Sequence, residues 1–314
     1  MAWVLVLVGV LLAYQAGVIV LMALAWRTAR VGPRRTPADL GVGFSTVRIP
    51  TLRNRRLHGW WIPGGEGRRP TVVLVHGWNR NAERTLPYVE ILHPAGYHLL
   101  AFDARHHGAS DPDGHGSMKK FSEDIRSAID FLAGRADVDG GRIAVVGLSI
   151  GGSAAIHAAA HDRRIRAVVT VGSFAHPREA IVQAGLGSPL LAPAIPLALR
   201  FLEWRIGARL DELAPERHAG RVAGRLLLVH GEDDRTVPVE HVARLLGAAR
   251  VNAEAWRIAG RGHSDCHQDP QFAGRVRAFL AGALERSGSL DTGAGAAEPR
   301  PGTDPRLPSR QLHP

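Results

Sequence analysis

The chain has 314 residues, a formal net charge of +10 and a single cysteine, Cys266. A chain of this length can bury a large core, and one cysteine excludes an internal disulfide framework and any metal site built from several cysteines. Nearly all the basic residues are arginines, and they are scattered along the chain with few aromatic residues between them. This distribution argues against a nucleic-acid-binding protein.

The N-terminal segment is the strongest compositional feature. Residues 2–26 read AWVLVLVGVLLAYQAGVIVLMALAW, with no charged residue and only Gln15 as a strongly polar interruption. Crossing a bilayer takes about 20 apolar residues, so residues 1–26 are predicted to form an uncleaved transmembrane anchor. A cleaved signal peptide ending at Ala25 is the alternative. It is disfavoured because no basic residue precedes the run, and the run is longer than a signal core of about 7–15 residues.

Four arginines follow this segment directly: Arg27, Arg30, Arg34 and Arg35. Arginines beside a membrane span tend to remain on the cytoplasmic side, so the rest of the chain is predicted to be cytoplasmic. Residues 27–43 are interpreted as a linker. The predicted partner of the N-terminal helix is therefore the membrane.

Residues 44–285 are predicted to form one α/β domain. FSTVRIP and RLHGWWIP indicate an antiparallel hairpin at the edge of a sheet. Short apolar runs then alternate with helix-length segments: TVVLVHG, HLLAFDA, RIAVVGLS, RAVVTVGS, RLLLVHG and AEAWRIAG are the expected strands, and 82–95, 119–134, 151–161, 239–249 and 270–285 the expected helices. Such alternation predicts a mostly parallel sheet covered by helices on both faces.

Two stretches depart from this alternation. Residues 175–224 include Pro189, Pro193 and Pro196, which are followed by the amphipathic LALRFLEWRIGARLDEL. The stretch is longer than an ordinary crossover, so a small helical lid is predicted there. A plain crossover helix with long loops is the alternative. Residues 286–314 are rich in Gly, Pro, Ser and charge without an apolar period, which predicts a disordered tail.

Ser149 lies in VVGLSIGGSAA, between a predicted strand and a predicted helix. Gly147 and Gly151, two residues to either side, allow a tight strand-to-helix turn that lifts the hydroxyl off the end of the sheet. The start of the helix supplies free backbone N–H groups where negative charge would develop. This context favours a nucleophile over a hydroxyl in an ordinary glycine-rich turn.

A serine nucleophile needs a base, and the base needs an acid to orient it. Glu232, Asp233 and Asp234 follow the strand RLLLVHG, which places carboxylates at the same edge of the sheet as Ser149. His263 follows the last predicted strand, in GRGHSD. The chain order serine, acid, histidine is the order of one fold class.

The chain resembles the α/β-hydrolases over about residues 44–285, and most closely the membrane-anchored serine esterases and lipase-like members with a small helical cap. The resemblance rests on VLVHGW, FDARHHGAS, GLSIGG, HGEDDRTVP and GRGHSD, which occur in order, each at a strand end. It implies Ser149 as nucleophile, Asp234 as acid and His263 as base, with Asp233 as the alternative acid. It also implies an oxyanion hole formed by the backbone N–H groups of Trp78 and Ile150.

One motif departs from the family pattern. DARHHGAS has His106 where members usually have a glycine, which puts the local turn in doubt. His76, His106, His107 and His267 lack the position of His263 after the final strand and are interpreted as structural residues. Cys266 is interpreted in the same way, as are Trp60, Trp61, Trp204 and Trp256, with Trp204 in the predicted lid the strongest candidate for a ligand contact.

The function predicted from these residues is hydrolysis of a carboxylic ester, a small molecule or lipid-like, through an acyl-enzyme. This chemistry needs neither an organic cofactor nor a metal. Peptidase, amidase or thioesterase activity would use the same triad, and a non-catalytic, membrane-tethered binding domain is the alternative from another class. Nothing in the sequence predicts an oligomeric state.

Overall fold

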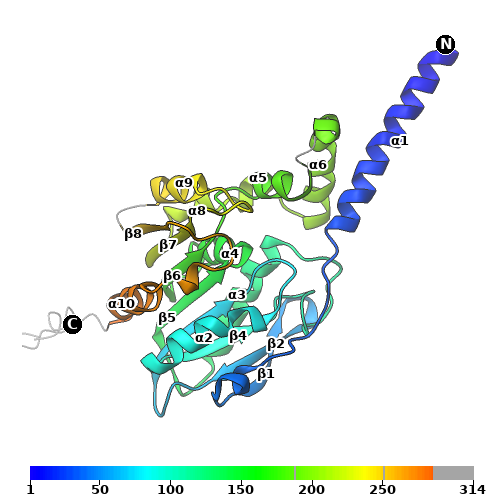
Figure 1. The fold of residues 1–314 in the computed structure, drawn as a ribbon. Helices are drawn as coiled ribbons and strands as arrows, with labels where there is room; N and C mark the ends of the chain where they lie inside the picture. Colours follow the sequence, from blue (N-terminus) through cyan, green and yellow to red (C-terminus); the bar gives the residue numbers. More distant parts are fainter. Residues whose placement is uncertain (187–188, 250–251, 286–314) are drawn as a thin grey trace, which may run out of the picture.

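A computed structural model of the chain describes residues 1–186, 189–249 and 252–285. Its centre is an eight-stranded sheet of order β1-β2-β4-β3-β5-β6-β7-β8 (Figure 1). The strands are β1 (Ser45–Thr51), β2 (Arg55–Ile62), β3 (Arg69–Val75), β4 (His98–Phe102), β5 (Val138–Leu148), β6 (Ile165–Val171), β7 (Arg225–Gly231) and β8 (Ala253–Ile258). Strands β3 to β8 pair in parallel, and β1 and β2 form the antiparallel hairpin at one edge. This confirms the predicted α/β-hydrolase fold.

Helices cover both faces of the sheet because the parallel strands are apolar on both sides. α3 (Met118–Ala133), α4 (Ile150–Ala159) and α9 (Glu240–Ala248) pack in one core layer, while α2 (Leu86–Leu92) and α10 (Phe272–Leu284) pack in the other. The two layers hold most of the buried side chains of the domain. Because helices cover both faces of the sheet, a binding site is expected at the ends of its strands.

Two predicted helices are divided in the structure. The expected helix at 82–95 is a 3-10 turn, α2 and a second 3-10 turn at His93–Ala95. Pro94 lacks the backbone N–H that would continue α2 beyond this point. The stretch predicted to be amphipathic becomes α6 (Ile195–Ile206) and α7 (Leu210–Leu213), because Gly207 takes φ 67° and its N–H donates to the carbonyl of Glu203.

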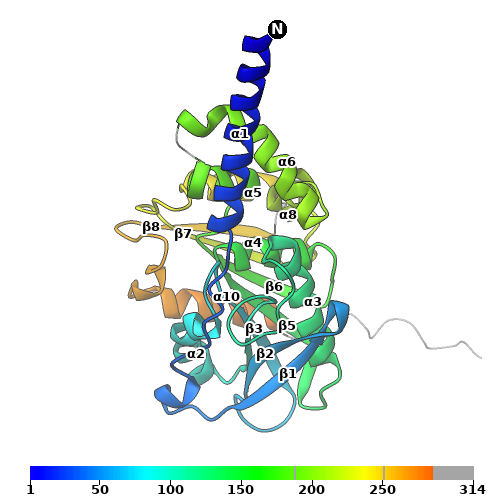
Figure 2. The same ribbon diagram turned by 90° about the vertical axis from the view of Figure 1, so that its right-hand side faces the viewer.

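The segment between β6 and β7 is helical. It holds α5 (Pro177–Ile181), a π-helical turn at Val182–Leu186, a 3-10 segment at Pro189–Ala194, then α6, α7 and α8 (Pro215–Ala219). α5 and α6 lie beyond one end of the sheet (Figure 2), whereas α8 packs against α4 and α9. The segment thus stands beside the edge of the sheet where Ser149 lies.

The N-terminal helix α1 (Ala2–Ala25) is the one described helix long and apolar enough to cross a membrane, within the ranges given above. It projects away from the domain at its N-terminal end, and its second half lies beside α6 (Figures 1 and 2). Val18 and Met22 are each 3% exposed and share a hydrophobic cluster with Ala198, Leu199 and Leu202 of α6. The predicted tail, residues 286–314, lies outside the described residues.

Candidate active site

Ser149 occupies a strained turn between β5 and α4. Its φ is 53° and its ψ is −122°, a region that residues with a β-carbon rarely adopt. The turn is held by the Ser149 N–H, which donates to the Val171 carbonyl at 2.8 Å, and by the Ser149 carbonyl, which accepts from the Gly152 N–H at 3.0 Å. The conformation is therefore imposed by the surrounding backbone.

The glycines beside the serine are required by close approach of the backbone. A β-carbon on Gly147 would lie 2.5 Å from the nitrogen of Gly152, and one on Gly151 would lie 2.5 Å from the carbonyl oxygen of His76. Both distances are far inside van der Waals contact. The structure thus gives a physical reason for the small residues that flank Ser149 in the sequence.

The strain at Ser149 gives a stability prediction. We expect Ser149→Gly to be more stable than Ser149→Ala by about 1 kcal/mol, because glycine relieves a strained φ worth roughly 1–3 kcal/mol but loses more chain entropy on folding. Both variants lack the hydroxyl, so the comparison isolates the backbone. Urea denaturation of the two proteins in the same detergent measures the difference, and an alanine variant as stable as the glycine variant would show that the turn is unstrained.

His263 and Asp234 form a direct pair at the same strand edge. His263 Nδ1 lies 2.6 Å from Asp234 Oδ2, and the Asp234 side chain is fully buried while that of His263 is 21% exposed. The other carboxylate oxygen, Oδ1, accepts from the N–H groups of Thr236 and Val237, each at 2.8 Å. These contacts fix the carboxylate, which in turn orients the imidazole.

Electrostatics keep Asp234 ionised. Burial alone would raise the pKa of this carboxyl, but hydrogen bonds from His230, His263 and the Val237 amide hold its pKa well below the usual range. His230 Nε2 is 3.3 Å from Asp234 Oδ2. Asp233, in contrast, is exposed, and its backbone N–H donates to the Arg261 carbonyl.

Ser149 and His263 line one cavity of about 560 Å³, together with the two predicted oxyanion residues, Trp78 and Ile150. The loop that carries Trp78 runs close to the serine, since a β-carbon on Gly77 would lie 3.5 Å from Ser149 Cβ. The rest of the wall is largely apolar and includes Trp26, Met118, Phe174, Ile181, Leu202, Ile206, Leu210 and Leu213. The cavity therefore combines a few polar groups with a large apolar surface, as small-molecule sites commonly do.

Part of this wall was not predicted from the sequence. Trp26 comes from the end of α1, and nothing in its sequence context connects it with Ser149. Leu199, Leu202 and Ile206 are spaced at the helical period of α6, and this spacing could have predicted which face of α6 points inward. Leu202 and Ile206 line the cavity. Trp204, singled out in the predicted lid, is instead 76% exposed.

The other histidines of the motifs have structural contacts. The His76 ring is fully buried, with Nδ1 2.7 Å from the Gly77 carbonyl and Nε2 accepting from the Ala104 N–H at 3.0 Å. Burial, with the nearby His107, lowers the pKa of His76 to about 3. His106 takes the left-handed φ of 67° expected of a glycine, and its Nδ1 accepts from the Asp113 N–H at 3.2 Å.

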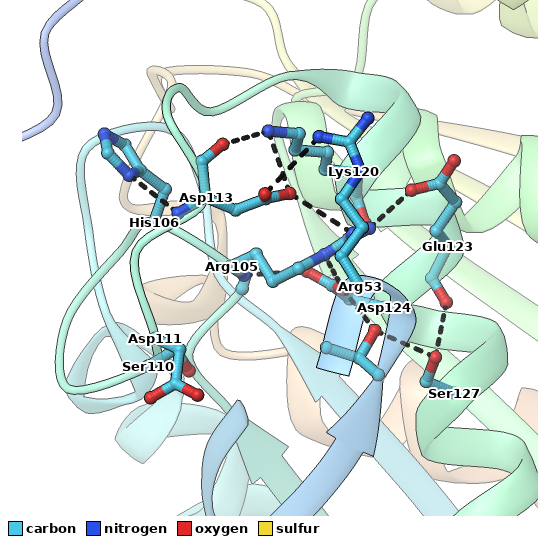
Figure 3. Close-up of polar contacts among 12 residues, drawn as sticks. Arg53, Arg105, His106, Ser110, Asp111, Asp113, Lys120, Glu123, Asp124 and Ser127 are labelled. Atoms are coloured by element: carbon cyan, nitrogen blue, oxygen red, sulfur yellow. Dashed lines mark hydrogen bonds and ion pairs between the residues drawn. The ribbon is translucent and has the colours of Figure 1, made fainter. Parts of the chain in front are cut away.

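A buried charge network fixes the loop between β4 and α3 (Figure 3). Arg105 is 1% exposed and donates to Asp124 at 2.6 Å, while Lys120 Nζ lies 3.0 Å from Asp113 Oδ2. Breaking one partner of such a network leaves an uncompensated buried charge, which costs about 3–5 kcal/mol. The network therefore holds in place the loop that ends at Ser117 and Met118 in the cavity wall.

The amino-acid sequence is similar to those of known proteins. The family model described as serine aminopeptidase, S33, matches residues 66–213. The uncharacterized protein YfhR of Salmonella typhi is 28% identical over 265 residues, covering 79% of this chain and 81% of that protein. The thiohydrolase aneE of Aspergillus aculeatus is 32% identical over 131 residues, which cover 41% of each chain.

A solved structure covers more of the domain. The esterase Pf2001 of Pyrococcus furiosus is similar with a TM-score of 0.68 and 25% identity, over 82% of this chain and 100% of that one. The sheet order and the strained turn at Ser149 are consistent with the fold of this structure. The chain has the α/β-hydrolase fold.

Proposed function

We propose that the protein is a serine hydrolase that cleaves carboxylic esters through an acyl-enzyme. The observation that carries the proposal is the 2.6 Å pair of His263 and Asp234, in the same cavity as a serine held in a strained strand-to-helix turn. A buried, ionised acid that fixes a partly exposed imidazole beside a serine is the arrangement that activates a hydroxyl at neutral pH.

In the proposed reaction, Ser149 Oγ attacks the acyl carbonyl and His263 Nε2 takes its proton. Asp234 stabilises the imidazolium through Nδ1, and the N–H groups of Trp78 and Ile150 stabilise the oxyanion. His263 then gives the proton to the leaving alcohol, and the acyl group remains on Ser149. Water then attacks the carbonyl of the acyl-enzyme while His263 takes a proton from it. The bond to Ser149 Oγ breaks, His263 returns the proton to Ser149, and the carboxylic acid leaves.

We propose residues 175–224 as a cap over this site, because α5, α6 and α7 contribute much of its apolar wall. Such a wall suits the acyl chain of a small or lipid-like ester. Likeness to an esterase over the whole length of that protein supports ester cleavage, whereas the relative named a thiohydrolase matches only part of this chain.

The choice among ester, thioester and amide is testable with one matched series. An oxygen ester, a thioester and an anilide that share one medium-length acyl chain are offered to the purified full-length protein, and kcat/KM is measured for each after subtraction of spontaneous hydrolysis. We expect the oxygen ester to give the highest kcat/KM. A higher kcat/KM with the anilide or the thioester would transfer the proposal to a peptidase or a thioesterase.

We further propose that α1 is a retained membrane anchor with the domain on the cytoplasmic side. Val18 and Met22 pack against α6, the Tyr14 hydroxyl donates to the Leu190 carbonyl, and Trp26 lines the cavity. Removing α1 as a signal peptide would expose the apolar side of α6 to water. The orientation rests on the arginines that follow α1, among them Arg27 and Arg30.

We expect the intact protein to sediment with membranes, to resist extraction by high salt, and to be released only by detergent. Apolar length rather than charge holds such a helix, so screening of the +10 charge should have no effect. Fractionation followed by N-terminal sequencing checks this. Release by salt would indicate a peripheral protein, and a mature N-terminus at Trp26 would indicate a cleaved signal.

Orientation is checked separately in sealed cells. Protease added from outside should leave the hydrolase domain intact, because the domain is proposed to lie inside. Digestion of the domain without permeabilisation would reverse the proposed topology.

A further inference from the structure

Three histidines converge at the C-terminal end of α4. His157 lies in α4, His161 follows it by one helical turn, and His218 lies in α8. One nitrogen from each ring lies within 4.8 Å of the corresponding nitrogens of the other two. The ring centroids of His157 and His218 are 4.4 Å apart.

Each of these rings is oriented by one hydrogen bond that leaves the other nitrogen available. His157 Nδ1 pairs with Ser122 Oγ at 2.8 Å, His161 Nδ1 with the His157 carbonyl at 2.8 Å, and His218 Nε2 with the Glu212 carbonyl at 2.7 Å. Histidines that ligate metals commonly use their second nitrogen in this way, because the hydrogen bond fixes tautomer and ring orientation. The nitrogens left over are His157 Nε2, His161 Nε2 and His218 Nδ1.

Burial makes one of these nitrogens costly to leave unpaired. His218 is 6% exposed, and its Nδ1 has no hydrogen-bond partner among the described residues. Buried polar atoms nearly always have a hydrogen-bond partner in native proteins, so an unpaired one indicates that a further ligand, such as an ion, can bind there.

We propose that His157, His161 and His218 bind a divalent transition metal ion of the Zn²⁺ type, with solvent as the fourth ligand. Three imidazole nitrogens suit Zn²⁺, and the exposed side of His161 leaves a route for the ion and for water. Zn–N bonds of about 2.0–2.1 Å place tetrahedral ligands about 3.3 Å apart, so the rings close slightly around the ion. The ion joins α4, which begins directly after Ser149, to α8 at the end of the proposed cap.

The surroundings set the strength of this site. Arg126, Arg217 and Arg221 act on the histidines as nearby positive charges, and the cluster itself contains no carboxylate or thiolate. A cation is therefore held by the imidazole lone pairs against electrostatic repulsion. We expect reversible binding, weaker than that of closed zinc sites with thiolate ligands.

The test is titration of the full-length protein, carrying a tag without histidine, with ZnCl₂ after removal of metals by a chelator. Calorimetry should show saturable binding of one ion per chain, the thermal midpoint should rise with Zn²⁺, and Co²⁺ should give the intense visible absorption of tetrahedral coordination. Binding to the folded state alone produces such a rise by mass action.

Variants distinguish this cluster from adventitious binding. Loss of a partner that merely orients a ligand costs about 10–100-fold in affinity, so Ser122→Ala should weaken Zn²⁺ binding by that factor and His161→Ala at least as much. His161 is exposed, so its replacement leaves the fold intact. The matched control is His93→Ala, on α2's side of the sheet, which should bind like the wild type.

Two further variants separate this proposal from the proposed hydrolase activity. Ser149→Ala and His263→Ala should both retain wild-type Zn²⁺ affinity, because neither residue belongs to the cluster. Absence of saturable binding in the wild type, equal affinity in His161→Ala and His93→Ala, or loss of binding in His263→Ala would each overturn the metal site.

Discussion

Replacing Ser149 by alanine should lower kcat/KM for ester hydrolysis by on the order of 10⁴-fold or more. Loss of one member of a triad removes most of what the whole unit contributes, and the remaining acceleration comes from the oxyanion donors and substrate binding. The effect should fall on kcat, because the hydroxyl acts in bond formation rather than in holding the acyl chain in the apolar cavity.

Initial rates over a range of ester concentrations measure this loss. Ser45→Ala is a matched control, since Ser45 is exposed on the edge strand β1, far along the sheet from the proposed site. It should hydrolyse esters like the wild type. Undiminished hydrolysis by Ser149→Ala would remove Ser149 from the mechanism.

Asp234→Asn should lower kcat by about 10⁴-fold, the size of effect that the wrong histidine tautomer produces in a triad. Asp234 Oδ1 already accepts two backbone N–H groups, so the asparagine carbonyl would keep that place and turn its NH₂ toward His263. His263 Nδ1 would then accept a hydrogen bond, the ring proton would move to Nε2, and the base would be lost.

Asp233→Asn is the matched control for this substitution. Asp233 is exposed and is next to Asp234 in the chain, so the same chemical change there should reduce turnover only weakly. Thermal denaturation of both variants shows whether the fold is retained. Equal losses of turnover, or the larger loss in Asp233→Asn, would move the acid to Asp233.

The sequence predicted the sheet well because its signals are local. Each parallel strand is a short apolar run that ends near a Gly, Asp or Ser, and the predicted edge hairpin is β1 and β2. The placement of Ser149, Asp234 and His263 at one strand edge follows from the same pattern, because carboxyl ends of parallel strands share an edge.

Contacts between distant segments were not predictable in the same way. Trp26 reaches the cavity because α1 packs against α6, and no periodicity in either segment specifies that pairing. His161 and His218 are in contact because α8 packs beside α4. Their large separation in the sequence gives no indication of this contact. The break between α6 and α7 at Gly207 could not be predicted from the glycine alone, since its left-handed φ depends on how the whole segment between β6 and β7 folds.

The central claim is that Ser149 is an activated nucleophile, and labelling with a fluorophosphonate probe tests it most directly. The probe reacts covalently with an activated serine, so detergent-solubilised wild-type protein should give a labelled band and a peptide adduct at Ser149. Ser149→Ala should give neither, while Ser45→Ala should label like the wild type. An unlabelled wild-type protein that is folded, or a label that persists in Ser149→Ala, would contradict the proposed hydrolase.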